Sequence, residues 1–173
     1  MNVALLRQGA DLLERIDDAP FTRIGPQIRH GLAFYACFLR GLPSGRIDYV
    51  HRERSARLET DRRFALHEVF ATIEAVEAID EAGWPEALQV RAEEGMDWAG
   101  STPAREAQFL ASHTTHHFAI VALLLRAAGI EPPEGFGVAP STTVAASLWG
   151  SEEDIVRRRT RSPDGALGWT LKR

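Results

Sequence analysis

The chain has 173 residues, of which 45% are hydrophobic and 25% are charged, and its formal net charge is -4. This composition is typical of a soluble globular protein and excludes a disordered or fibrous one. The charge balance provides no basic field, so we expect no nucleic-acid partner. Cys37 is the single cysteine, which excludes an internal disulfide and a zinc site built from cysteines.

The sequence shows no signal for export or for membrane insertion. Its first twenty residues are amphipathic and carry charges at Arg7, Asp11 and Glu14, unlike the apolar core of a signal peptide. The longest nearly uncharged apolar run, residues 118–125, is too short to span a bilayer. We therefore expect a cytoplasmic protein without a membrane partner.

Helical periodicity dominates the first half of the chain. Apolar residues spaced by three and four predict a helix over 3–16, which Ala19-Pro20 should end. A second helix is expected to begin near Gly25-Pro26 and to stop at residues 41–43. A polar loop should follow, and a long third helix should then run over 54–82.

The last long helix has the clearest ends. Thr102 suits the N-cap, Pro103 suits the first helical position, and Gly129 suits the C-terminal end. The segment before it, residues 87–101, alternates partly around a central glycine. That pattern predicts either two short strands or an irregular excursion.

Four long helices with mostly short connections predict an all-α fold, namely an antiparallel four-helix bundle with a short β-hairpin between the third and fourth helices. We expect the bundle to form a metal-binding domain over residues 1–142. Residues 143–173 form a C-terminal tail to which the pattern assigns no structure, apart from some helical character around 152–159. The basic run 157–161 is read as the solvated end of that helix, with anion or nucleic-acid binding as the alternative.

Three histidines are candidate metal ligands. His113 and His117 lie four residues apart, so a helix places both rings side by side on the apolar face that includes Leu110 and Val121. Burying two imidazoles without partners would cost roughly several kcal/mol of folding free energy. They therefore need a shared ion or hydrogen bonds to carboxylates or water. His30 lies on the inward stripe of the second helix and could complete a half-shell of three neutral imidazoles.

The remaining histidines have plainer interpretations. His116 lies about 100° round the helix from His117, where it either shares the interior edge or faces a partner, and it aims less easily at the same point. His67 is expected to be partly exposed, and His51 lies in the polar loop. Cys37, two turns after His30, is interpreted as a core residue, with a fourth ligand as the alternative.

Two charged positions also leave alternatives open. Arg52 belongs to a loop with Asp48, Tyr49 and Arg54, which is either salt-bridged or able to hold a substrate carboxylate. Glu106, two turns before His113, has either an ion-pair or capping role or a role in supporting the site.

The runs SHTTHHFAIVALLLRAAGI and FGVAPST, together with GPQIRHGLAFYACFLRGL and IDYVHRERSARLETD upstream, resemble the DinB-like or YfiT-like family of metal-dependent enzymes. The resemblance covers residues 25–142. It implies a four-helix bundle with one divalent ion, zinc or nickel, on His30, His113 and His117. It also implies a homodimer, a small-molecule substrate and, in some members, a low-molecular-weight thiol.

The chemistry at such an ion has two candidate forms, and the catalytic residues remain unassigned. The ion would favour either thiol-dependent S-transfer or hydrolysis by an activated water. Thr114 occupies the position that glutamate takes in the H-E-x-x-H arrangement of zinc proteases, which favours S-transfer or non-catalytic metal binding over hydrolysis. A non-enzymatic metal-binding or dimerisation module is the third possibility.

Overall fold

The computed structural model describes residues 1–139. A compact unit spans Met1–Val138, and the predicted tail, 143–173, lies outside the described residues together with the last residues of the predicted domain. The elements are α1 (Asn2–Arg15), α2 (Asp18–Gly41), β1 (Arg46–Asp48), α3 (Arg57–Thr60), α4 (Arg62–Glu77), β2 (Leu88–Arg91), β3 (Ala99–Ser101) and α5 (Pro103–Ala127), with 3-10 turns η1 (Leu42–Ser44) and η2 (Glu81–Gly83).

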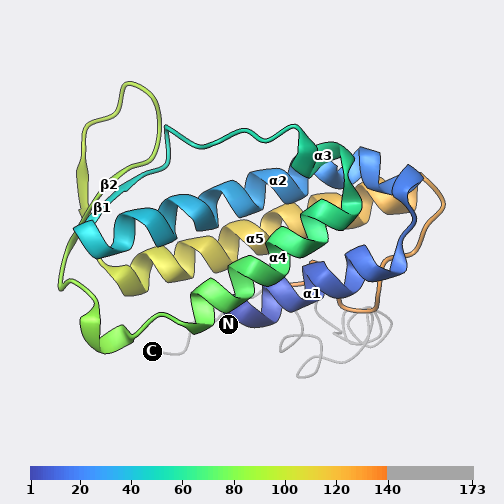
Figure 1. The fold of residues 1–173 in the computed structure, drawn as a ribbon. Coiled ribbons are helices and arrows are strands. Elements are labelled where there is room, and N and C mark those ends of the chain that lie inside the picture. Colours follow the sequence, from blue (N-terminus) through green and yellow to red (C-terminus); the bar gives the residue numbers. More distant parts are fainter. Residues whose placement is uncertain (140–173) are drawn as a thin grey trace, which may run out of the picture. The chain divides into compact units, whose positions relative to one another are not determined.

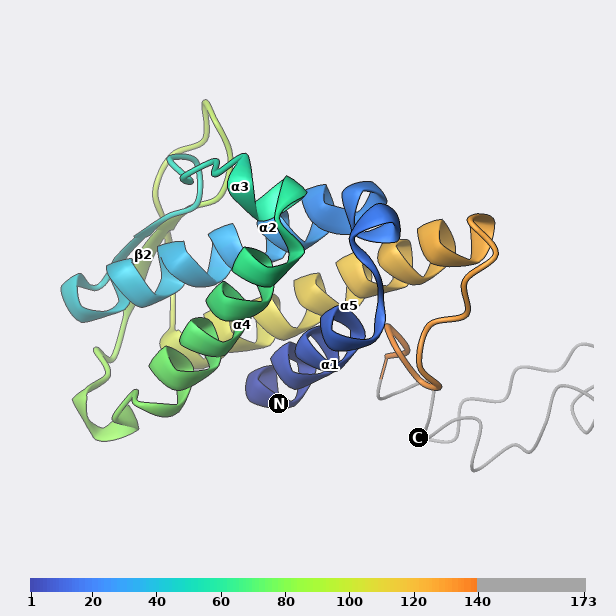
Figure 2. The same cartoon turned by 45° about the vertical axis from the view of Figure 1, so that its right-hand side comes forward.

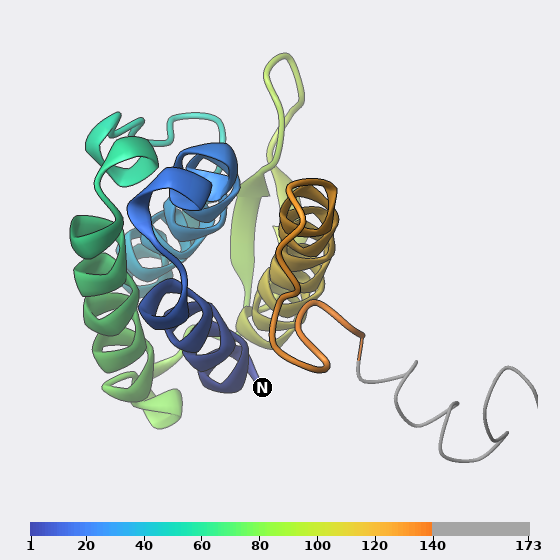
Figure 3. The ribbon, with the colours of Figure 1, turned by 90° about the vertical axis from the view of Figure 1, so that its right-hand side faces the viewer.

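Within this unit, the helices α1, α2, α4 and α5 pack around a common core, and α2 contacts both α4 and α5 (Figure 1). The core includes apolar side chains from all four helices and from the strands; those almost fully buried on the helices include Leu13, Phe21, Ile24, Ala65, Val121 and Leu125. Figure 3 shows the same helices viewed roughly down their axes, with α1 between α4 and α5. Within residues 1–139, no helix has the length and apolar character needed to cross a membrane.

Polar contacts between helix ends show how α1, α2 and α4 run relative to one another. Arg62, at the start of α4, pairs with Asp18 at the start of α2 over 2.7 Å, so α2 and α4 run the same way. Arg7 near the start of α1 pairs with Glu77 at the end of α4, so these two helices are antiparallel. The predicted antiparallel order is therefore wrong for α2 and α4, because the connection from β1 to α3 runs back along α2 (Figures 1 and 2).

A small sheet lies where α2 ends and α5 begins. Its strand order is β1-β2-β3, with β1 parallel to β2 and β2 antiparallel to β3. The expected pair of strands in 87–101 is confirmed as β2 and β3. Residues 1–139 are thus mostly helical, but the sheet does not fit the predicted all-α class. The sequence pattern missed β1, because three residues inside a polar loop carry no period of their own.

Several helix boundaries differ from the prediction, among them the end of the third long helix, which was expected at residue 82 and lies at Glu77. Helix α2 begins at Asp18, because Pro20 lies in its first turn, where proline is tolerated, and not at the end of α1. The predicted helix 54–82 is divided into α3 and α4 at Asp61, whose extended backbone and side chain cap α4 by accepting a hydrogen bond from the Phe64 amide. The predicted helix over 3–16 is confirmed as α1.

Helix α5 has the ends that the sequence predicts. The Thr102 side chain accepts a hydrogen bond from the Arg105 amide, and Pro103 is the first helical residue. At the other end Gly129 has φ +76°, and the amides of Gly129 and Ile130 donate to the carbonyls of Arg126 and Leu125. This is a Schellman motif, which needs a left-handed residue that glycine adopts without strain.

Candidate metal centre

His30, His113 and His117 converge on one point between α2 and α5. One ligand atom from each lies within 4.8 Å of the other two, close enough to hold one metal ion. The ring centroids of His30 are 5.1 Å from His113 and 4.4 Å from His117, and those of His113 and His117 are 4.5 Å apart. Two nitrogens bound to one tetrahedral zinc ion are about 3.4 Å apart, so the three rings would close slightly around an ion when it binds.

The three imidazoles are suited to act as neutral ligands. All three rings are half-buried, and burial is the main cause that lowers the pKa of His30 and of His113 to about 4. The charge of His117 lowers both values further, and burial also lowers the pKa of His117 itself. At neutral pH the rings are therefore unprotonated and keep a lone pair for an ion.

His113 has a buried nitrogen that nothing in the described chain satisfies. Its Nε2 atom has no hydrogen-bond partner within residues 1–139. An unpaired buried polar atom costs on the order of 1–3 kcal/mol. A metal ion at the point where the rings converge would remove that cost, so the donor set fits a divalent cation by its chemistry as well as by its spacing.

Gln27 orients His117. The Nδ1 atom of His117 lies 2.6 Å from Oε1 of Gln27, one turn before His30 on α2. Because an amide oxygen only accepts, His117 donates from Nδ1 and leaves its Nε2 lone pair free. No role was predicted for Gln27, although its position on the same helix face as His30 is a signal that the sequence contains.

Aromatic rings form one wall of the site. The Phe34 ring lies 5.0 Å from the His30 ring and 4.2 Å from the His113 ring, and Phe109 contacts His113 at 5.3 Å. On the other side of this wall, Tyr49 stacks on Phe34 at 5.0 Å. This packing limits the orientations that the two imidazoles can adopt.

Glu106 has a structural role in the wall and does not reach the three rings. Its carboxylate, 1% exposed, accepts hydrogen bonds from the Tyr49 hydroxyl, from Ser101 and from Arg105. Burial is the main cause that raises the pKa of Tyr49, and the negative charge of Glu106 raises it further. The expected ion pair of Glu106 with Arg105 is therefore confirmed.

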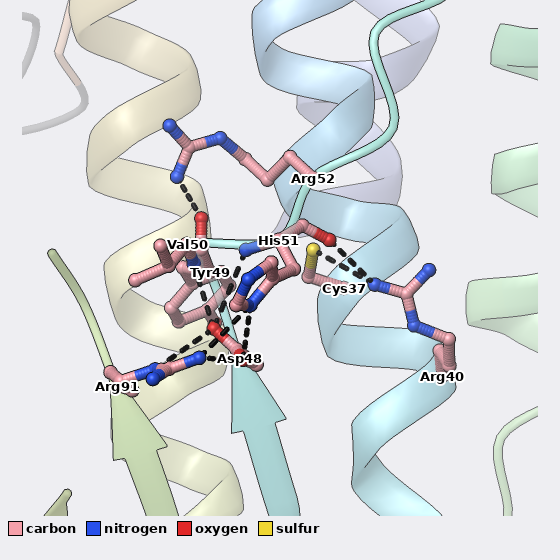
Figure 4. Close-up of polar contacts among 8 residues, drawn as sticks. All are labelled: Cys37, Arg40, Asp48, Tyr49, Val50, His51, Arg52 and Arg91. Atoms are coloured by element: carbon pink, nitrogen blue, oxygen red, sulfur yellow. Dashed lines mark hydrogen bonds and ion pairs between the residues drawn. The ribbon is translucent and has the colours of Figure 1, made fainter. Parts of the chain in front are cut away.

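Asp48, at the end of β1, and Arg52, in the loop that follows, make separate contacts (Figure 4). Asp48 binds Arg91 and the ring of His51, and the hydrogen bond with Arg91 is the main cause that holds the Asp48 pKa well below its usual range. Arg52 extends from the same loop toward the side on which α5 lies, and donates to the carbonyl of Tyr49. The salt-bridged interpretation of the loop thus holds for Asp48 but not for Arg52.

The other candidate residues lie outside the convergence point. Cys37 is buried beside Arg40, whose Nη2 is 3.5 Å from the sulfur, and burial raises the pKa of its thiol. His116 is exposed, with its ring 5.3 Å from His117, and His51 and His67 are exposed, as predicted. Cys37 is not part of the group of possible ligands found within the described residues.

Comparison with models of known families finds none that matches the chain, and comparison with curated proteins and with solved structures finds no match either. The convergence of the three histidines therefore rests on the geometry of this chain alone, and the DinB-like resemblance stays a prediction.

Proposed function

We propose that the protein is a divalent-metal-dependent enzyme of the DinB-like type, a four-helix bundle that holds one zinc or nickel ion on His30, His113 and His117. We propose further that it joins a low-molecular-weight thiol, through its sulfur, to an electrophilic small molecule. The observation that supports this most directly is the meeting of three imidazoles from α2 and α5 within 4.8 Å.

The chemistry follows from the donor set. Held by three neutral imidazoles, a divalent ion keeps its charge and lowers the pKa of a thiol or water that joins it. In the proposed transfer, the thiol loses its proton to solvent, its sulfur forms a bond to an electrophilic carbon, and the leaving group departs with the electrons of the broken bond. The chain contributes the imidazoles, their orientation through Gln27 and the wall formed by Phe34.

Hydrolysis is less well supported, because it calls for a carboxylate near the reacting water. Thr114 follows His113 in the sequence, and its buried hydroxyl donates to the Leu110 carbonyl instead of facing the site. Glu106 is engaged by three donors. Thus, neither the residue next to the pair nor the nearest carboxylate along α5 is free to act as a base.

Metal analysis of the purified protein is the first test. We expect one zinc or nickel ion per chain after reconstitution, and loss of the ion in His30→Ala and in His117→Ala. His116→Ala is the matched control, since it removes a neighbouring imidazole that lies outside the group. If the unmutated protein holds far less than one ion and the variants lose nothing, the histidines only pack.

Activity is the second test. The metal-loaded protein is assayed with a panel of thiols against a panel of alkylating electrophiles, beside the metal-free protein. Loss of free thiol that depends on the ion supports S-transfer, and ester cleavage without a thiol supports hydrolysis instead. An ion that binds without any turnover would identify a non-enzymatic metal-binding module.

A further inference from the structure

Arg52 lies beside the three imidazoles without belonging to them. Its guanidinium carbon is 4.6 Å from the centre of the Phe34 ring, and the same ring contacts His30 and His113. It is close enough that its charge contributes to lowering the pKa of both histidines. A side chain from the loop after β1 therefore places a positive charge beside the site built by α2 and α5.

Its charge has no carboxylate partner within residues 1–139, in contrast to other arginines around the site. Arg29 pairs with Glu59, Arg91 pairs with Asp48, and Arg105 pairs with Glu106. The polar contact of Arg52 in the described chain is the one from Nη1 to the Tyr49 carbonyl. Its Nε and Nη2 atoms thus have no hydrogen-bond partner within the described residues. Neither is a fully buried atom, so both can be reached by a ligand.

The free edge has a specific geometry. The Nε–H and one Nη2–H of a guanidinium point the same way and match the two oxygens of a carboxylate. Phe34 and the Tyr49 carbonyl hold the guanidinium plane in place, so less side-chain entropy is lost when an anion binds. The remaining donors therefore favour a planar carboxylate.

The charges around the site point to the same ligand. After burial, the groups with the largest effects on the pKa of His30 and His113 are neighbouring imidazoles and arginines, not carboxylates. A divalent ion with three neutral ligands would add two positive charges next to that of Arg52. A half-buried site with such a net charge is stabilised by an anionic occupant.

We propose that Arg52 forms a carboxylate-binding subsite next to the metal centre, so that one of the small molecules that enter the site carries a carboxylate. This inference rests on the proposed function and deepens it. The carboxylate belongs either to the thiol or to the electrophile; the chemistry that Arg52 recognises is the same in both cases.

The subsite is tested by measuring how small ligands bind to the nickel-loaded protein. The thiolate-to-nickel absorption band reports the binding. The first arm compares 3-mercaptopropionate with its uncharged amide at fixed pH. The second arm titrates butyrate and butyramide onto protein already saturated with 2-mercaptoethanol, and follows the change in that band. We expect the acid to bind about tenfold more tightly than its amide in one arm, and Arg52→Gln to abolish that preference.

The arm in which the acid binds more tightly identifies the molecule that carries the carboxylate. A preference in the first arm assigns the carboxylate to the thiol, and a preference in the second arm alone assigns it to the electrophile. Arg54→Gln is the matched control, because it removes the same charge from an exposed position in the same loop and should leave the preference intact. Arg52→Lys, which keeps the charge but loses the planar fork, should retain only part of it.

Several results would overturn the proposal. A preference for the acid that persists in Arg52→Gln would show that the carboxylate binds nickel directly, and no preference in either arm would show that no subsite exists. If Arg52→Gln does not fold, the unmutated protein is tested with 2-(trimethylammonio)ethanethiol, whose quaternary ammonium cannot bind nickel and should weaken binding relative to 2-mercaptoethanol; equal binding would overturn the subsite. Metal content is measured throughout: absence of the ion defeats the proposed function, whereas a bound ion without preference defeats the subsite alone.

Discussion

The Oε1 atom of Gln27 lies 2.6 Å from Nδ1 of His117, and this contact joins residues 90 positions apart in the sequence. It connects α2, which carries His30, to α5, which carries the other two imidazoles. One helix therefore supplies a candidate ligand and also sets the orientation of a ligand on the other helix.

Replacing Gln27 should weaken metal binding without removing a ligand. In Gln27→Leu the His117 ring loses its acceptor and can rotate or change tautomer, so we expect metal affinity to fall by about 10–100-fold. Competition with a chromophoric chelator measures the affinity. Gln8→Leu, at an exposed position on α1, is the control and should bind the ion as the unmutated protein does. Equal affinity in both variants would show that Gln27 does not orient the ligand.

Removal of the ion should lower thermal stability. A ligand that binds only the folded state at about 1,000 times its Kd stabilises by about 4 kcal/mol, which corresponds to about 10 °C in Tm for a chain of this size. We expect a drop of this order when a chelator is added, measured by circular dichroism. The drop should vanish in His113→Asn, because this variant binds no ion and its Tm should be the same with and without chelator. A chelator effect that survives in that variant would place the ion elsewhere.

The metal-free protein should lose stability as the pH falls from about 6.5 to about 4. The pKa of His30 and of His113 is lowered to about 4 in the folded chain, below the value of 6.5 in an unfolded one. Between these values the unfolded chain binds more protons, so acid favours unfolding, and the stabilisation is complete above pH 6.5.

Chemical denaturation across this pH range measures the effect. The double variant His30→Gln/His113→Gln should flatten the pH dependence in this window, whereas His67→Gln, at an exposed position on α4, should not change it. A slope that is the same in all three proteins would mean that other groups titrate on unfolding.

Two glycines on α2 should respond in opposite ways to alanine. A Cβ at Gly25 would collide with the backbone of Glu59, so Gly25→Ala must separate α2 from α3 and should cost about 1–3 kcal/mol. A Cβ at Gly31 would meet nothing within 4 Å, and Gly31→Ala should stabilise the helix by about 0.5–1 kcal/mol. Urea denaturation of both variants gives the comparison; destabilisation of equal size would contradict the close approach at residue 25.

Local signals in the sequence were enough to predict α5 and the grouping of the histidines. Thr102, Pro103 and Gly129 mark the helix ends through contacts within a few residues, so the sequence contains all the information needed. The positions of His113 and His117 follow from helical geometry alone. That the ring of His30 reaches them was an inference from its place on an apolar stripe, and the structure confirms that it does.

Features that depend on distant partners could not be predicted in this way. Strand β1 exists because Arg46–Asp48 pair with Gln89–Arg91, a relationship that a three-residue segment does not encode. The pairing of Asp48 with Arg91, 43 residues away, likewise left Arg52 without a carboxylate. The start of α4 is a different case, since Asp61 is a residue type that favours the N-cap, and the long apolar stripe obscured it.

The parallel pairing of β1 with β2 also bears on the order in which the chain assembles. It closes a loop that contains all of α3 and α4, and the entropy of closing a long loop is lost before its contacts form. Helices α1 and α2, adjacent in sequence, face no such delay. The segment that presents Arg52 should thus reach its final place late in folding, and its amides should exchange with solvent sooner than those of α2 and α5.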